Sequence, residues 1–151
     1  MLSIREISGD ELYPVWEWDE RDPDDPYPKT SWDDYLTRYS QPRFTHYGIF
    51  KAGVLAACLT IELWSATDYE AHISSARHLL TPQELRRAVM ALQKAVIANG
   101  AKRIICFIPS YLRAAQRLAI ACGLRRANEY STAMMFRGKP VILIKFTYEK
   151  E

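Results

Sequence analysis

Hydrophobic and polar positions alternate along the chain in two rhythms, which predict short strands and amphipathic helices. Helical spacing of apolar residues predicts helices near residues 10–20, 32–39, 82–98 and 111–122. Period-two alternation, or a short continuous apolar run, predicts strands at residues 2–7, 45–50, 54–62, 69–75, 103–108, 129–136 and 141–148. Helices lying between strands in this order indicate an α+β (three-layer α/β) fold, in which helices pack on the faces of a mixed sheet.

Short local motifs mark where several of these elements begin and end. The TPQE motif at residues 81–84 combines a helix N-cap, a proline at the first helical position and a glutamate at the third, and SWDD at residues 31–34 is a similar capping box. KAG at residues 51–53 predicts a hairpin turn, whereas Pro14 is expected to interrupt the first helix. Residues 19–28 hold three prolines and five acidic side chains, which predict a loop.

Length and charge add a second constraint. The 151 residues suit one globular domain, and no linker divides residues 1–151. The net charge of +2 hides an asymmetry, because residues 1–76 sum to −8 and residues 77–151 to +10. Either the two halves interleave in space and cancel, or the basic half meets an acidic or anionic partner.

The sequence also argues against several classes of protein. No apolar run reaches the ~18 residues of a membrane span, and the first residues lack the basic and apolar regions of a signal peptide. Cys58, Cys106 and Cys122 show no CxxC spacing, which argues against a disulfide framework and against a metal site. We therefore expect a cytoplasmic protein of a reducing compartment, with no membrane partner.

The order of elements resembles the GCN5-related N-acetyltransferase (GNAT) fold over about residues 2–148. The hairpin YGIFKAGVLAACLTI, the capped helix after the fourth strand and the segment CFIPSYLRAAQRLAIACGLRRANEY carry the resemblance. The last of these looks like the family's fourth helix leading into a glycine step. The resemblance implies a mostly antiparallel sheet with helices on both faces, and acetyl-CoA as a possible cosubstrate.

The family's cofactor motif is altered in this chain. The family has Q/R-x-x-G-x-G/A after the fourth strand, and its backbone N–H groups bind the pyrophosphate of acyl-CoA at a helix N-terminus. Arg77 matches the first position, but Leu80 and Pro82 replace the glycines and make a poor phosphate cradle. Alternatively, this segment only caps a helix and its arginines are solvated. If acyl-CoA binds, the resemblance places at it Ile73, Ser75, Arg77, Thr81, Gln83, Arg86 and Arg113.

The family's catalytic tyrosine is missing as well. That general acid, four residues before the glycine of the fourth helix, corresponds to Ala119. Tyr111 or Tyr130 would have to replace it, or would serve only in packing. Glu62 on the third strand and Glu70 on the fourth are the candidate general bases.

Two other groups of residues are open to a structural or a functional interpretation. His46 and His72 also lie on predicted strands, where a lone histidine is more often structural or a surface group than a base. The acidic, aromatic-rich segment 16–39 could attract a cationic amine, or could be a solvated loop with a few core aromatics.

A second resemblance covers residues 74–148 and concerns small GNAT-like internal virion or head-assembly proteins of short-tailed bacteriophages. The basic helix TPQELRRAVMALQKAV, a strand with Glu129-Tyr130, an Arg137-Gly138 turn and the last strand VILIKF carry it. It implies protein partners, virion components among them, and packaging in a virion.

Two hypotheses follow. The chain is either a GNAT-like protein with a degenerate acyl-CoA site that acts by protein binding in phage assembly, or an acetyl-CoA-dependent N-acyltransferase that modifies an amine. Nucleic-acid binding is disfavoured, because no nucleic-acid motif accompanies the arginines of the basic half.

Overall fold

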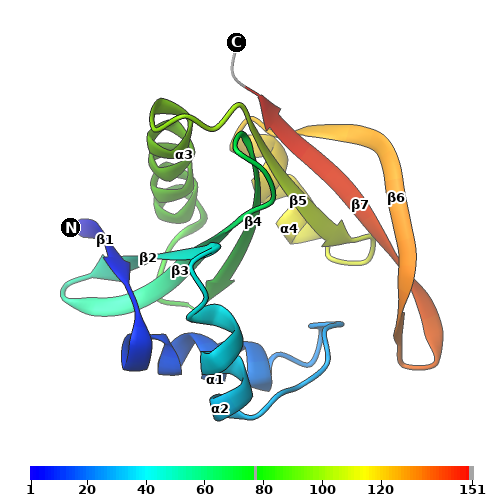
Figure 1. Cartoon of the computed structure of the whole chain (residues 1–151), viewed down its shortest axis with the longest axis horizontal. Helices are drawn as coiled ribbons and strands as arrows, with labels where there is room; N and C mark the ends of the chain where they lie inside the picture. The colour runs from blue at the N-terminus through cyan, green and yellow to red at the C-terminus, as the bar shows by residue number, and fades with distance from the viewer. Residues whose placement is uncertain (77, 150–151) are drawn as a thin grey trace.

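Seven strands form one sheet with the order β1-β2-β3-β4-β5-β7-β6 (Figure 1). Neighbouring strands are antiparallel except for the parallel pair β4 and β5, which confirms the predicted mixed α+β architecture.

The computed structural model describes residues 1–76 and 78–149, without the side chains of residues 129–133. None of the helices in these ranges is long and apolar enough to cross a membrane. The elements are β1 (Leu2–Ile7), a 3₁₀ turn (Gly9–Leu12), α1 (Tyr13–Arg21), α2 (Trp32–Tyr39), β2 (Phe44–Lys51), β3 (Val54–Leu63), β4 (Asp68–Ser75), α3 (Pro82–Ala98), β5 (Arg103–Pro109), α4 (Arg113–Ala121), β6 (Arg125–Phe136) and β7 (Lys139–Glu149).

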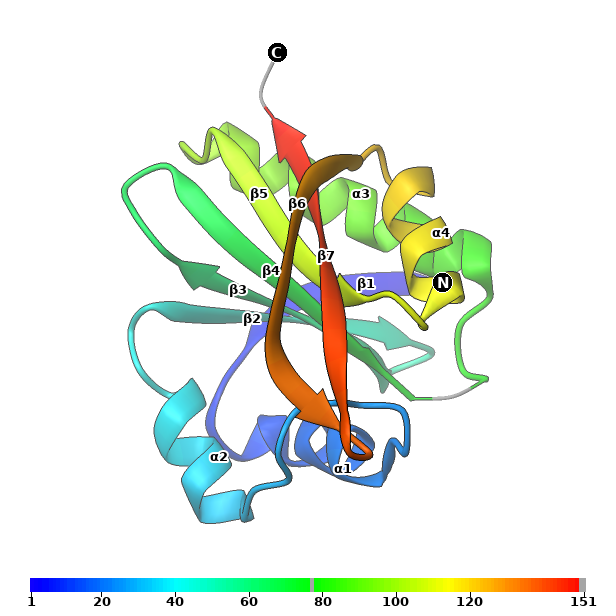
Figure 2. The same ribbon diagram turned by 90° about the vertical axis from the view of Figure 1, so that its right-hand side faces the viewer.

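Two pairs of helices cover opposite faces of the sheet. Figure 2 shows α3 and α4 on one side of the strands and α1 and α2 on the other. Successive residues of a strand point to opposite faces. On β3, Leu59 therefore packs in the same core as Leu92 of α3, whereas Cys58 packs with Val15 of α1. The sheet thus separates the core residues packed against α3 and α4 from those packed against α1 and α2.

The predicted helix caps and hairpin form as expected. The Thr81 hydroxyl accepts a hydrogen bond from the Glu84 N–H (3.1 Å), and the Glu84 carboxylate accepts one from the Thr81 N–H (3.0 Å). Ser31 likewise accepts a hydrogen bond from a backbone N–H three residues later. In the β2–β3 turn Ala52 and Gly53 both have positive φ (51° and 78°), as a tight hairpin requires.

Several element boundaries differ from the prediction. Pro14 does not interrupt a helix, because α1 begins at Tyr13 and the proline lies in the first turn, where its missing N–H is not needed. α4 begins at Arg113, two residues later than expected. β6 begins four residues earlier than expected, since Arg125 already pairs with Thr147 of β7 although its charged neighbours give no alternating pattern.

β4 and β5 separate after a short paired stretch. They are in register only where Asp68–Glu70 meet Arg103–Ile105, although β4 continues to Ser75 and β5 to Pro109. Figure 1 shows the two strands diverging beyond this point. The divergence opens the middle of the sheet along the second half of β4, and the candidate site lies there.

Candidate functional site

The gap between β4 and β5 opens, on the side of α3 and α4, into an apolar cavity of about 170 Å³. Ala115 and Ala119 of α4 line it, and their small side chains leave the space open. Ala119, where the family's tyrosine is expected, thus contributes only a methyl group to the wall. Aliphatic side chains form most of the remaining wall, including Leu59, Ile61, Ile73, Ile104, Ile108, Leu112, Leu118 and Leu124. The cavity, called here the apolar channel, suits an extended and uncharged chain.

Backbone groups of β4 face this gap. The Ala76 N–H donates a hydrogen bond to the Ala56 carbonyl of β3 (2.9 Å). Hydrogen-bonding direction alternates along an antiparallel strand, so the N–H groups of Ile73 and Ser75 point the other way, toward β5. β5 has already diverged there and pairs with β4 only as far as Glu70. The predicted pair Ile73 and Ser75 therefore presents backbone donors at the gap.

The N-terminus of α3 is already capped. Pro82 has no N–H, and the capping box satisfies the N–H groups of Thr81 and Glu84. The Lys51 ammonium lies 2.8 Å from the Glu84 carboxylate. Hydrogen bonds from Lys51 and from the Thr81 backbone lower the pKa of Glu84 to about 2. A carboxylate thus occupies the positive end of the helix, which adds a physical reason to expect poor phosphate binding at this turn.

The other residues assigned to a cofactor are dispersed. Arg77 lies outside the described residues. Gln83 is exposed in the first turn of α3, and Arg113 is exposed at the first residue of α4. The Arg86 guanidinium donates a hydrogen bond to the Ala121 carbonyl (2.9 Å), so it ties α3 to the end of α4. The structure therefore brings Ile73 and Ser75 to the gap, whereas Arg86 makes a structural contact and Arg113 is exposed at the start of α4.

The opposite face of the sheet carries an acidic, aromatic pocket of about 230 Å³ beneath α1, α2 and their connecting loop. Glu62 and Glu70 lie directly opposite each other on β3 and β4, and both line this pocket. The structure thus brings the two candidate bases together. Further carboxylates and aromatic rings lining it are Trp16, Asp19, Glu20, Asp25, Tyr27, Asp34, Tyr35, Tyr39 and Phe44.

The environments of the two glutamates differ. The Glu62 carboxylate forms an ion pair with the Arg43 guanidinium at 3.2 Å. Burial raises the pKa of Glu70, the adjacent charge of Glu62 raises it further, and the Trp64 indole N–H, which donates to its carboxylate (3.2 Å), opposes these effects. The pKa of Glu70 thus moves toward neutral pH, as a general base requires.

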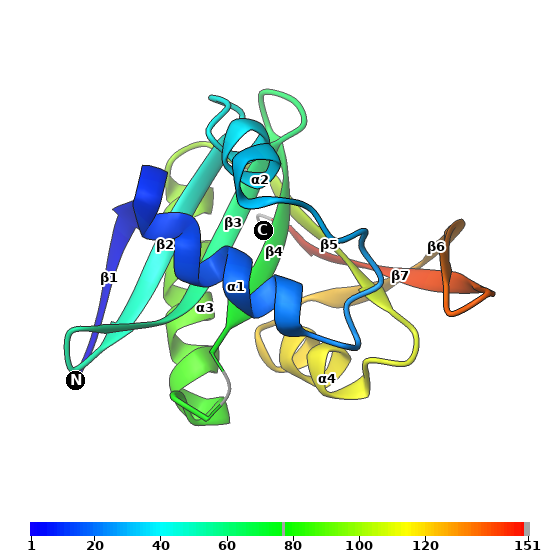
Figure 3. The ribbon, with the colours of Figure 1, turned by 90° about the horizontal axis from the view of Figure 1, so that it is seen from below.

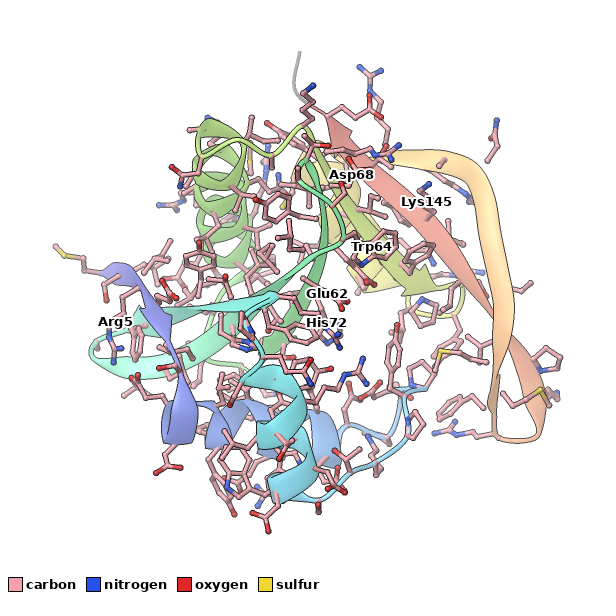
Figure 4. All side chains as sticks on the ribbon, viewed as in Figure 1. Arg5, Glu62, Trp64, Asp68, His72 and Lys145 are labelled. Carbon is pink, nitrogen blue, oxygen red and sulfur yellow. The ribbon has the colours of Figure 1, made fainter. Side chains whose placement is uncertain are left out.

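His72 connects the two sides of the sheet. It lines the acidic pocket, the apolar channel and a third cavity bounded by Trp18 and Ser74. The Tyr27 ring meets it edge-on, with centroids 6.2 Å apart. Figure 4 shows His72 and Glu62 directed to the same side of their strands.

A buried carboxylate lies beside His72. Asp19 of α1 accepts a hydrogen bond from the Ser74 hydroxyl at 2.8 Å. Burial raises the pKa of Asp19, and the charge of His72 and the Ser74 hydrogen bond lower it. Asp19 therefore links α1 to the end of β4 close to the junction.

Tyr111 lies apart from Glu62 and Glu70. It lines none of the three cavities named above, and its hydroxyl donates a hydrogen bond to the Asp24 carbonyl (2.8 Å). The structure therefore does not bring the third candidate catalytic residue to the other two. The side chain of Tyr130, the alternative acid, lies outside the described residues.

Sequence reasoning missed the position of His72. The residue lies two positions after Glu70, so both share one face of β4, and this spacing was the available signal.

His46 is a structural residue, which is one of the two interpretations that the sequence left open. It is buried, and its two ring nitrogens form hydrogen bonds with the Thr60 hydroxyl (2.9 Å) and the Tyr39 carbonyl (2.8 Å).

The thiols are poor candidates for nucleophiles. Burial raises the pKa of both Cys58 and Cys106 to about 12, which keeps them protonated at neutral pH. Within residues 1–76 and 78–149, no cluster of His, Cys, Asp and Glu has an arrangement that could hold a metal ion. The ionisable side chains that line the acidic pocket are its carboxylates, His72, Lys29, Arg38 and the three tyrosines Tyr27, Tyr35 and Tyr39.

Comparisons with known proteins bear on the fold. No protein-family model matches the chain, and no curated protein sequence matches it. Among similar solved structures, the spermidine N-acetyltransferase of Vibrio cholerae in complex with CoA and spermine has a TM-score of 0.80 and 13% identity, covering 98% of this chain and 95% of its own. The ribosomal-protein-alanine N-acetyltransferase of Brucella melitensis gives 0.81 and 10% over 98% and 99%, and an N-acetyltransferase of Staphylococcus aureus gives 0.80 and 12% over 99% and 97%.

Identities this low establish a shared fold and no more. They lend no support to the resemblance to phage virion proteins. The match extends over nearly the whole chain and so includes the sheet described above. The chain has the GCN5-related N-acetyltransferase fold.

Proposed function

We propose that this protein is an acetyl-CoA-dependent N-acyltransferase that acts on a cationic amine. One observation carries the proposal: an apolar channel lies beside the gap between β4 and β5 on one face of the sheet, an acidic pocket lies on the other face, and His72 lines both. The similar structures named above are N-acetyltransferases, one of them with CoA and spermine bound, which supports the same reaction class.

The apolar channel fits the pantetheine arm of acyl-CoA. Its walls are aliphatic, and the backbone N–H groups of Ile73 and Ser75 face the gap, where an extended amide chain needs donors. The phosphate end fits less well, because the capping box and Glu84 occupy the N-terminus of α3. Phosphates would rely on exposed basic side chains such as Arg113 and Arg117 of α4.

The acidic pocket fits a cationic acceptor. Carboxylates attract an ammonium group, and aromatic faces stabilise it further. When bound, acyl-CoA supplies an activated thioester carbonyl for attack by an amine. Glu70 accepts the proton that the ammonium must lose before it attacks. His72 and Tyr27, which line the junction, can hydrogen-bond to the departing thiolate, which takes up the second proton that the nitrogen loses after attack.

Acetyl-CoA binding is the first test. Calorimetric titration and thermal unfolding at 1 mM acetyl-CoA should both report binding, and a ligand at about 100 times its Kd stabilises by about 2.7 kcal/mol. Ala115→Phe should abolish binding because the ring fills the apolar channel. Ala114→Phe is the matched control, since Ala114 is the exposed neighbour on α4.

Acetyl transfer is the second test, with thiol release followed for spermine and for a neutral amine as acceptors. We expect spermine to be preferred and the preference to weaken with salt. Glu70→Gln should lower kcat/KM and remove the acidic limb of its pH profile. Binding without transfer to any amine would overturn the proposed reaction.

A protein-binding role without catalysis is the second candidate, and the capped N-terminus of α3 favours it. One result distinguishes the acyltransferase from the binding role. No heat and no thermal shift at 1 mM acetyl-CoA would refute the acyltransferase and leave the binding role.

A further inference from the structure

Contacts from distant parts of the chain hold the loop of residues 22–31, which connects α1 and α2. The Tyr111 hydroxyl donates a hydrogen bond to the Asp24 carbonyl (2.8 Å). The Arg137 guanidinium donates one to the Pro23 carbonyl (2.9 Å) and lies 3.9 Å from the Asp24 carboxylate. The loop, called here the acceptor loop, is thus bonded to the β5–α4 junction and to the β6–β7 turn.

The two anchoring side chains also support each other through a third. The Tyr111 ring stacks on Phe136, with centroids 5.8 Å apart and planes 10° apart. The Arg137 guanidinium lies over the same ring at 4.8 Å. In Figure 2 the turn of the β6–β7 hairpin reaches the level of α1, where the acceptor loop begins. Phe136 therefore fixes both donors in position for the loop carbonyls.

The acceptor loop needs such external support. It has no helix or strand, and its prolines at positions 23, 26 and 28 remove backbone donors. Its own hydrogen bonds are short-range, such as the Asp22 carboxylate accepting from the Asp24 N–H (3.0 Å). The Lys29 ammonium donates to the Asp19 and Asp22 carbonyls at 2.6 and 3.1 Å, which ties the loop to the end of α1. Tyr111 and Arg137 attach it to the β5–α4 junction and to the β6–β7 turn.

The same loop builds the acidic pocket. Asp25 and Tyr27 line both the acidic pocket and the third cavity at the junction, and Tyr27 meets His72 edge-on. Figure 3 shows the loop running from α1 toward the β5 and β7 side of the sheet before it returns to α2. We propose that Tyr111, Phe136 and Arg137 form a latch that holds the acceptor loop over the acidic pocket and positions Asp25 and Tyr27 for the amine. The amine-binding part of this inference rests on the proposed function, whereas the latch itself does not.

Hydrogen exchange of the loop amides tests the latch without any activity. Tyr111→Phe keeps the stacked ring and removes the hydroxyl, and Arg137→Gln removes the guanidinium. Each should speed exchange of the amides in residues 22–31 by about two- to tenfold, the range expected when one hydrogen bond is lost. Tyr13→Phe is the control, because Tyr13 is exposed on α1 and lines neither the acidic pocket nor the third cavity.

Acetyl-transfer kinetics test the positioning role. In the Tyr111→Phe protein we expect the KM for the amine to rise several-fold while the KM for acetyl-CoA stays unchanged, which a general loss of folding would not produce. Unchanged amide exchange in both variants would overturn the latch. Faster exchange with an unchanged amine KM would overturn the positioning role. Faster exchange in a protein that transfers no acetyl group would support the latch and refute the proposed function.

Discussion

Gln93 is the buried polar side chain through which α3 holds α4 beside the apolar channel. It is 4% exposed, and its side-chain amide donates a hydrogen bond to the Cys122 carbonyl at 2.9 Å. Cys122 is the C-cap of α4, where carbonyls have no partner within the helix. With Arg86 on Ala121, two side chains of α3 bind the last carbonyls of α4.

Gln93→Met isolates this hydrogen bond. Methionine keeps the length and flexibility of glutamine, so the cavity it leaves is small. The Cys122 carbonyl stays buried and unpaired, which costs about 1–3 kcal/mol. For a chain of this size each kcal/mol lowers Tm by about 2–4 °C, so we expect a fall of roughly 2–12 °C.

Urea unfolding followed by circular dichroism measures the change, and an unchanged m-value shows that the denatured state is unaffected. Gln83→Met is the matched control on the same helix, because Gln83 is exposed, and should change stability by no more than about 0.5 kcal/mol. Equal stability of the Gln93→Met and Gln83→Met proteins would refute the argument that this bond fixes α4.

Three further changes test the packing, the caps and the buried histidine. Gly48→Ala places a Cβ 2.9 Å from two side chains and should cost about 1–3 kcal/mol in urea unfolding; a smaller cost would mean that the sheet adjusts freely there. Thr81→Ala should cost about 1 kcal/mol and Thr81→Ser much less, since serine keeps the capping oxygen; equal losses would contradict the cap. Burial lowers the pKa of His46, and its hydrogen bond to the Tyr39 carbonyl opposes this effect. The neutral, buried imidazole therefore contributes its full stability above about pH 6.5, and this contribution is lost as the pH falls through the lowered pKa. The free energy of unfolding should drop more steeply from pH 7 to 5 in the wild type than in His46→Gln, and parallel slopes would refute this.

The sequence predicted the elements best where the local signal agreed with the tertiary structure. The 81–84 capping box and the 51–53 hairpin depend on adjacent residues, and both formed as expected. The start of β6 was missed because its pairing with β7 is set across the sheet and its first residues, Arg125 and Arg126, have no apolar alternation. The local sequence pattern was therefore enough to predict the order of the elements, whereas the start of β6 depends on its long-range pairing with β7.

The site was predicted in part for the same reason. Glu62 and Glu70 were identified as strand carboxylates, but only the β3–β4 register places them opposite each other. The spacing of His72 from Glu70 puts both residues on one face of β4, but the point where β4 leaves β5 is set by pairing across the sheet. Arg86 was assigned to a phosphate on charge alone, whereas in the structure its guanidinium donates a hydrogen bond to the Ala121 carbonyl at the end of α4.

The charge asymmetry between the two halves of the chain acquires a physical meaning in this fold. Some charges cancel across the halves, since Arg103 pairs with Asp68 (2.7 Å). Four carboxylates of α1, α2 and their loop, Asp19, Glu20, Asp25 and Asp34, instead line the acidic pocket on one face of the sheet. Arg113 and Arg117 are exposed on α4, which covers the other face. For the proposed reaction this separation matters, because a cationic amine and an anionic acyl-CoA that entered by one opening would pair with each other, whereas entry from opposite faces brings only their reacting ends together at the gap.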